Sequence, residues 1–368
     1  IRQFIRTHQP FHWFVEFYSI MKDGGFDIVI GNPPYVEYTN IKNDYTVLGY
    51  KTERCGNLYA FLTERSLDLL RSDGRFGMIV PISGFCTDRM EDFRLVQLRN
   101  SANLWLSNYA ERPSKLFSGV ERNLSISLIQ LNKNGNNENK VFTTTYLKWH
   151  SEFRDKLFEN IVYTDSTSTK SLGIIPKVGT QTEVKLLAKL RKINKNLGNS
   201  TWPSQTSYVL YYRNSGGRYW KIVTDFQPEF FLNGGQSVSS RETYLYFASR
   251  EALQVAISVL SSSLYYWFYV LHSDTRTNNP SDLKTFPLDI EALSTDNLVQ
   301  LCSLCASLMN DYKRNSILKD AKYRTGNVKF QEFYPIKSKS IIDEIDRVLA
   351  KHYGFTEEEL DFIINYDI

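Results

Sequence analysis

The chain has 368 residues, a formal net charge of +4 and 42% hydrophobic residues, values that exclude a disordered or fibrous protein. Its length allows two folded domains. Four cysteines are too few for a disulfide framework, so we expect a reducing, cytoplasmic environment.

Positive charge is concentrated in the middle of the chain. Residues 171–338 contain 20 Lys and Arg against 13 Asp and Glu, whereas residues 339–368 contain three basic and eight acidic residues. This distribution indicates a module that faces a polyanion, followed by a solvated acidic end.

The first informative stretch, residues 26–35, reads Phe-Asp-Ile-Val-Ile-Gly-Asn-Pro-Pro-Tyr. Its β-branched run predicts a buried strand, which ends at Gly31 because two prolines follow. We expect a rigid loop at the carboxyl end of a parallel strand, where open α/β sheets bind their ligands. The simpler interpretation is a proline-stiffened turn after a core strand.

The groups on this loop suit one chemical task, which is to hold a planar amino group. The side-chain oxygen of Asn32 and the carbonyl of Pro33 would accept the two amino hydrogens, so that the nitrogen lone pair is freed to attack a methyl group. Tyr35 would stack on the base that carries the amino group.

An α/β pattern continues beyond this loop. Helical spacing over residues 57–71 and 90–98 alternates with strands at 76–80 and 104–109. Two later strands, at residues 124–128 and 141–147, flank a polar turn and predict a hairpin. We therefore expect an α/β catalytic domain over residues 1–163.

A polar stretch, residues 164–173, is the best linker candidate, and we expect a second domain over residues 174–368. The predicted elements of this domain are a basic helix, short aromatic strands and several helices, at residues 181–197, 208–213, 218–223, 243–247 and 251–271, with terminal helices from Thr295 and Ser338.

Two features of the second domain have an alternative interpretation. Residues 252–271 contain no charge and are long enough to span a bilayer, but their serines and tyrosines favour a buried helix pair and no membrane. Cys302 and Cys305 have helical spacing and no second ligand pair, which favours helix packing over zinc and predicts no metal.

Four spaced motifs carry a family resemblance. They are residues 25–31 with the following Asn-Pro-Pro-Tyr, Asn57-Leu58-Tyr59, residues 74–81, and Lys115-Leu116-Phe117. Together they resemble the gamma-class DNA adenine-N6 methyltransferases, which include type IIG restriction-modification enzymes and phage-defence methyltransferases. The resemblance covers about residues 11–147.

This resemblance implies a reaction. It implies double-stranded DNA as substrate, a flipped adenine as target and S-adenosyl-L-methionine as methyl donor. The implied catalytic residues are Asn32, Pro33, Pro34 and Tyr35, with Tyr35 and Phe117 against the flipped base and Asn32 also near the cofactor. The implied fold is the C-terminal half of a Rossmann-like methyltransferase sheet followed by an α+β target-recognition domain.

One departure from the family concerns the cofactor. The Gly-rich turn and the acidic ribose-binding residue of the family would lie upstream of Ile1, so we expect a longer parent protein and little activity from this chain alone. A nuclease, if the parent has one, would also be expected upstream.

The carboxyl part resembles a TaqI-like target-recognition domain at Tyr211-Tyr212-Arg213, residues 217–220, residues 260–268 and residues 285–288. The resemblance implies polar side chains that read bases and bind phosphates. The candidates are Arg213, Arg218, Arg276, Asn278, Asn279 and Lys284.

Three other functions compete with DNA methylation. The same loop suits RNA or protein-amide N-methyltransferases, although the long second domain favours duplex DNA. A non-catalytic DNA-specificity module would explain the missing cofactor half. A nuclease interpretation rests on Asp165, Glu183 and Lys185, which fall on a linker and a helix rather than on paired strands.

Overall fold

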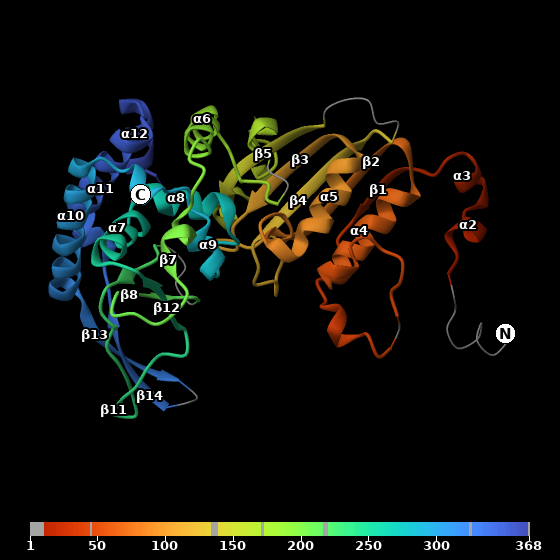
Figure 1. Ribbon diagram of the computed structural model, residues 1–368. Helices are drawn as coiled ribbons and strands as arrows, with labels where there is room; N and C mark the ends of the chain where they lie inside the picture. Colours follow the sequence, from red (N-terminus) through yellow and green to blue (C-terminus); the bar gives the residue numbers. More distant parts are fainter. Residues whose placement is uncertain are drawn as a thin grey trace. The chain divides into compact units, whose positions relative to one another are not determined.

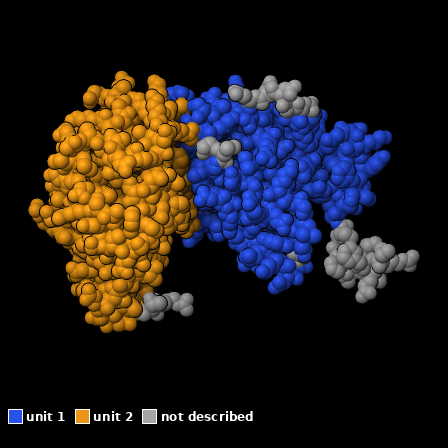
Figure 2. Space-filling view, viewed as in Figure 1, with its two compact units in different colours: residues 1–181 blue, residues 182–368 orange. Residues whose placement is uncertain are grey.

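The chain divides into two compact units, residues 1–181 and residues 182–368 (Figure 2). A computed structural model describes residues 11–44, 46–133, 139–170, 173–215, 220–323 and 326–366.

The first unit is built on a six-stranded mixed sheet with the order β1-β2-β4-β3-β5-β6 (Figure 1). β1 runs parallel to β2 and β3 parallel to β5, and the other neighbours are antiparallel. This arrangement confirms the predicted α/β class. The strands are β1 (Phe26–Gly31), β2 (Leu70–Pro81), β3 (Ser101–Tyr109), β4 (Leu124–Leu131), β5 (Lys140–Leu147) and β6 (Thr164–Asp165).

The predicted hairpin between residues 124–128 and 141–147 is wrong, because β3 lies between β4 and β5. Buried polar groups of the three strands meet at Asn108. Ser125 Oγ on β4 donates to Asn108 Oδ1 at 2.8 Å, and Asn108 Nδ2 donates to the Thr144 carbonyl on β5 at 3.1 Å. Asn108 thus satisfies polar groups of both neighbouring strands, which would be left unpaired without it.

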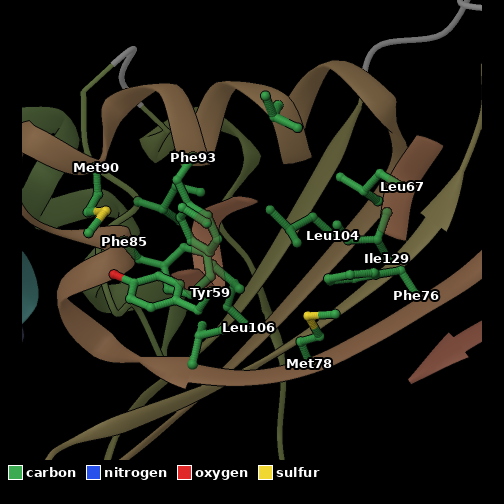
Figure 3. Close-up of a cluster of buried hydrophobic side chains, with 14 of the residues drawn as sticks. Tyr59, Leu67, Phe76, Met78, Phe85, Met90, Phe93, Leu104, Leu106 and Ile129 are labelled. Atoms are coloured by element: carbon green, nitrogen blue, oxygen red, sulfur yellow. The ribbon is translucent and has the colours of Figure 1, made fainter. Parts of the chain in front are cut away.

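Two helices of the first unit, α4 (Leu58–Leu69) and α5 (Glu91–Asn100), pack on the sheet, while α2 (Trp13–Glu16) and α3 (Tyr18–Lys22) precede β1. The side chains between sheet and helices form the main core (Figure 3). Its centre is the fully buried Phe93, whose ring lies 5.4 Å from the rings of both Tyr59 and Phe85. This core fixes the helices that follow the Asn-Pro-Pro-Tyr motif.

The expectation that β1 is buried is wrong. β1 pairs only with β2, at the edge of the sheet, and Ile28 and Ile30 are 64% and 80% exposed. The β-branched run fits a strand, but burial also needs an element to cover it, and none of the described residues does so.

The predicted linker, residues 164–173, begins as a strand of the first unit, and the unit ends after Gln181. β6 pairs with β5, Thr143 Oγ1 donates to the Val178 carbonyl, and the Ile175 amide donates to the Phe85 carbonyl. Polar side chains of the predicted linker bond to the first sheet, because Ser166 Oγ donates to the Val141 carbonyl and Thr167 Oγ1 accepts from the Val141 amide.

The second unit is of the expected α+β kind, with two four-stranded sheets of orders β7-β12-β8-β9 and β11-β10-β14-β13. The strands are β7 (Thr201–Trp202), β8 (Val209–Arg213), β9 (Val223–Thr224), β10 (Phe230–Leu232), β11 (Gly235–Gln236), β12 (Glu242–Phe247), β13 (Ile317–Tyr323) and β14 (Gly326–Glu332). The sequence patterns did not predict β13 and β14.

Helices dominate the core of the second unit. They are α6 (Gln181–Leu190), α7 (Arg250–Leu260), α8 (Ser263–His272), α9 (Pro280–Lys284), α10 (Thr295–Asn315), α11 (Lys339–Tyr353) and α12 (Glu357–Ile364). Cys302 and Cys305 lie on α10, which confirms their helical placement. α6 is shorter than the predicted helix over residues 181–197.

The uncharged stretch forms the buried pair α7 and α8, bent by 68° at its break. The carboxylate of Asp346 on α11 accepts hydrogen bonds from the amides of Ser263 and Leu264 at the start of α8. No single helix among the described residues has the length and hydropathy to cross a bilayer, and only this bent pair meets that test jointly.

The buried core and the exposed edge strand of the first unit predict different losses of stability when a side chain is truncated to alanine. Phe93→Ala should lower the free energy of unfolding by about 3–5 kcal/mol, because it removes a fully buried ring. Ile30→Ala should change it by less than about 0.5 kcal/mol, since Ile30 is exposed. Urea unfolding of the chain followed by circular dichroism measures both, and equal losses would contradict the edge position of β1.

Candidate functional site

The Asn-Pro-Pro-Tyr motif follows directly from the end of β1. Gly31, the last residue of this strand, is paired in register with Met78 of β2. Pro33 is buried, whereas Asn32 and Pro34 are exposed. The motif therefore lies at the carboxyl end of a parallel strand pair, as predicted, with its amide side chain accessible.

The Tyr35 hydroxyl fixes the shape of the motif. It lies 2.9 Å from Asn32 Oδ1 and 3.0 Å from the carbonyl oxygen of Ile79 on β2, and these two acceptors share its single proton. The ring is half-buried and meets Tyr59 edge-on at 6.3 Å. Burial raises the pKa of Tyr35 to about 12, so the phenol is protonated at neutral pH and acts as a donor.

The two oxygens that the sequence singled out keep accepting capacity. A carbonyl oxygen has two lone pairs, and the Tyr35 hydroxyl uses one of those on Asn32 Oδ1. No described residue donates a hydrogen bond to the carbonyl of Pro33. The motif thus offers two acceptors, one on a side chain and one on the backbone.

The segment after the motif is held by Glu37. Arg89 donates two hydrogen bonds to the Glu37 carboxylate, at 2.8 and 3.1 Å, and Asn57 Nδ2 donates a third at 3.2 Å. Burial would raise the pKa of Glu37, but the Arg89 hydrogen bonds and charge outweigh it, so the pKa is lowered. Asn57 also caps α4 by accepting from the Tyr59 amide, which couples the motif to the helix.

Tyr35 and Phe117 contact the same apolar cluster, formed by Tyr109, Leu116, Leu124 and Trp149. Both rings are half-buried at its margin. The structure therefore brings together the two aromatic residues that the sequence proposed for base stacking, although they are 82 residues apart in the sequence.

Arg154 is a residue of this site that the sequence patterns did not predict. Its guanidinium donates to the carbonyls of Lys115 and Leu116, at 3.2 and 2.7 Å, and lies 5.6 Å above the Trp149 ring. It thereby fixes the segment that carries Phe117. No sequence motif marks Arg154, because its partners are backbone atoms distant in the sequence.

A pocket of about 440 Å³ opens next to the same cluster. It is lined by residues of the stretch from Leu147 to Ile161, including Trp149, Phe153 and Lys156. Asn32, Tyr35 and Phe117 do not line it, so it is separate from the two acceptors of the motif.

The candidate DNA-binding residues of the second unit occupy different environments. Arg213 and Arg276 are exposed and Lys284 is half-buried, while Arg218 lies outside the described residues. Asn278 is 1% exposed, so the expectation of a base-reading side chain there does not fit this structure.

Asn279 has a structural role in the fold. It forms a capping box with Asp282 at the start of α9, where Pro280 occupies the first turn. The segments of Arg213 and Arg276 do come together, since the Asn278 amide donates to the Asn214 carbonyl and Ser215 pairs with Thr277.

The residues of the nuclease interpretation do not form one cluster of exposed ligands. Asp165 belongs to β6 of the first unit, whereas Glu183 and Lys185 belong to α6 of the second. Glu183 is 1% exposed and accepts a hydrogen bond from Trp267 Nε1. It is bonded within the core of its own unit.

Comparison with known proteins supports the resemblance found in the sequence. Residues 2–117 match the Eco57I restriction-modification methylase family. The chain is 29% identical over 175 residues, 46% of its length, to a protein of Methanocaldococcus jannaschii described as a type II restriction enzyme and methyltransferase. The match covers 14% of that protein, so the chain spans a small part of this relative.

Two of the solved structures that match this chain are restriction-modification enzymes. One is the type IIL enzyme MmeI in complex with DNA, with a TM-score of 0.47 and 9% identity, over 96% of this chain and 57% of that one. Another is a nuclease-deletion mutant of the type ISP enzyme LlaGI with a DNA substrate mimic, with a TM-score of 0.41 and 10% identity, over 85% and 47%. The chain spans about half of each.

The Glu37 contacts predict that the segment after the motif becomes less protected when Arg89 is removed. Arg89→Ala should speed hydrogen exchange of the Tyr38 and Leu58 amides, which bond to Gly56 and Val36, because Glu37 loses its main partner. Arg54→Ala is the matched control, since it removes an exposed ion pair with Asp92. Exchange mass spectrometry over residues 36–58 measures the effect, and equal behaviour of the two variants would disprove it.

The Arg154 contacts predict a second, separate response. Arg154→Ala should increase exchange over residues 115–120 and shift Trp149 fluorescence, because two hydrogen bonds and the stacked guanidinium are removed. Lys156→Ala, an exposed change in the same stretch, should leave both signals unchanged. Unaltered exchange in the Arg154 variant would show that the Phe117 segment is held by other contacts.

Proposed function

We propose that this chain, whose residues 2–117 are related to restriction-modification methylases, is the target-binding part of a site-specific DNA adenine-N6 methyltransferase. The observation that carries the proposal is the pair of accepting oxygens at Asn32 and Pro33, next to the half-buried ring of Tyr35. The substrate is an adenine flipped out of duplex DNA, and the system is a restriction-modification or phage-defence system.

The chain's own residues orient the target amino group. One amino hydrogen is accepted by the second lone pair of Asn32 Oδ1 and the other by the Pro33 carbonyl. Both bonds draw the nitrogen toward a pyramidal geometry, which localises its lone pair for attack. Tyr35 remains a protonated donor that holds Asn32 in place, and it is not a general base.

Stacking offsets the cost of base flipping. Extruding a base costs a few kcal/mol, and each base–aromatic stack contributes about 1–3 kcal/mol. Tyr35 and Phe117 contact one apolar cluster, which suits two rings that act on the same base. Arg154 positions the Phe117 segment and does not touch the base in this proposal.

The described residues do not by themselves fit the methyl donor that a methylase requires. The end of β1 supplies the exposed Asn32 side chain, and the nearby Ile28 and Ile30 are apolar, so no set of groups there matches the charged ends of S-adenosyl-L-methionine. In this proposal a longer parent protein carries the groups that bind the methyl donor.

The test uses the product of the complete gene. Incubation with S-adenosyl-L-methionine and DNA should yield N6-methyladenine, detected by mass spectrometry of the hydrolysed nucleosides. Asn32→Ala should reduce the rate at least about 100-fold with DNA affinity nearly unchanged, because it removes one of two preorganised acceptors. Asn40→Ala, a nearby exposed change, is the matched control and should retain full activity.

Other outcomes would identify the competing functions. DNA binding without methylation by the complete protein indicates a specificity module. Methylated RNA or glutamine amide with unmodified DNA indicates the other N-methyltransferase classes. Methylation that survives in the Asn32 variant rejects the assigned role of this residue.

A further inference from the structure

Positive charge in the second unit is concentrated at two places, residues 183–195 with five Lys and Arg against one Glu, and residues 313–338. Residues 313–338 contain seven Lys and Arg against two Asp and Glu, a surplus of five out of the surplus of seven in residues 171–338. This segment comprises the end of α10, the strands β13 and β14, and the turn that follows.

The two strands form a long antiparallel ribbon. Seven residue pairs run from Ile317 with Glu332 to Tyr323 with Gly326, and β13 is the edge of its sheet. The ribbon extends away from the helices α7 and α10 (Figure 1). At about 3.4 Å per residue the ribbon is roughly 20 Å long. On its other side β14 pairs with β10, so the ribbon forms one side of a four-stranded sheet.

The two faces of the ribbon differ. On one face Ala321 lies opposite Val328, which is 7% exposed, and Lys319 is bonded to Glu332 at 3.0 Å. This face is occupied by packing and by an internal ion pair.

The other face is open and basic. Lys322 lies opposite Asn327, and Lys329 lies opposite Asp320. Lys322, Asn327 and Lys329 are exposed, and their side chains form no hydrogen bond or ion pair with the described residues. The register therefore puts two ammonium groups, one amide and the exposed carboxylate of Asp320 on a single surface with a net positive charge, which we call the ribbon face.

We propose that the ribbon face binds duplex DNA, with Lys322 and Lys329 on phosphates and Asn327 toward the base edges. Lysines neutralise phosphates and release counterions, whereas an amide both donates to and accepts from bases in the groove. The proposal rests on the proposed function, since it identifies the element through which the second unit holds the substrate.

The experiment compares two double variants of the complete protein. Lys322→Ala with Lys329→Ala removes the charge of the ribbon face, and Lys192→Ala with Lys351→Ala removes two exposed lysines elsewhere in the same unit. Affinity for duplex DNA is measured by fluorescence anisotropy over a series of salt concentrations. Unfolding midpoints of both variants should match those of the unmodified protein.

The ribbon variant should bind about tenfold more weakly, and its plot of log affinity against log salt should be flatter by about 2, since each phosphate contact contributes about 0.9. The control variant should keep the original slope. Asn327→Ala should also keep it, because an amide displaces no counterion.

Two results would overturn the proposal in different ways. A complete protein that does not bind DNA rejects the proposed function and the ribbon proposal together. A protein that binds DNA, with the same salt slope in the ribbon variant, rejects the ribbon proposal alone. The lysines would then serve only to protect an edge strand from pairing with other chains.

Discussion

The site depends on one hydrogen-bonding group, the Tyr35 hydroxyl. Two consecutive prolines provide no backbone N–H, so the turn after β1 has no donors of its own at those positions. Tyr35 supplies a donor from its side chain and bonds to Asn32 within the turn and to Ile79 on β2. Because β2 also aligns β1, a single strand sets both the direction of the motif and its conformation.

Polar contacts of Glu37 and Glu64 extend this rigidity to the following segment. Glu37 joins Arg89 and Asn57, and Glu64 on α4 accepts hydrogen bonds from the amides of Lys51 and Thr52. The segment is therefore fixed near both of its ends. An active site that works by orienting a reactant needs this preorganisation, because its acceptors must be in place before the reactant arrives.

In the second unit, apolar helices form the core and most of the basic side chains lie at the surface. Aromatic helices form the interior, and Asn278 and Asn279 serve packing and helix capping. Seven basic residues lie on the β13–β14 ribbon, the adjacent end of α10 and the turn that follows, and five more lie in residues 183–195. A polyanion can then be bound at the surface while the helices keep a dry interior, since the charged groups remain hydrated until they meet phosphate.

The motif, the α/β class and most helices could be predicted from residue order alone, because periodicity and prolines act over a few residues. Folding was needed to show which strands are neighbours, that Ile30 is exposed and that Arg154 holds the Phe117 segment. These depend on groups brought together from distant parts of the chain. The alternation of side chains along a strand determines which residues share a face, but not which strand lies beside it. The neighbouring strands, the elements that cover each face and the long-range backbone contacts therefore depend on assembly of the whole sheet.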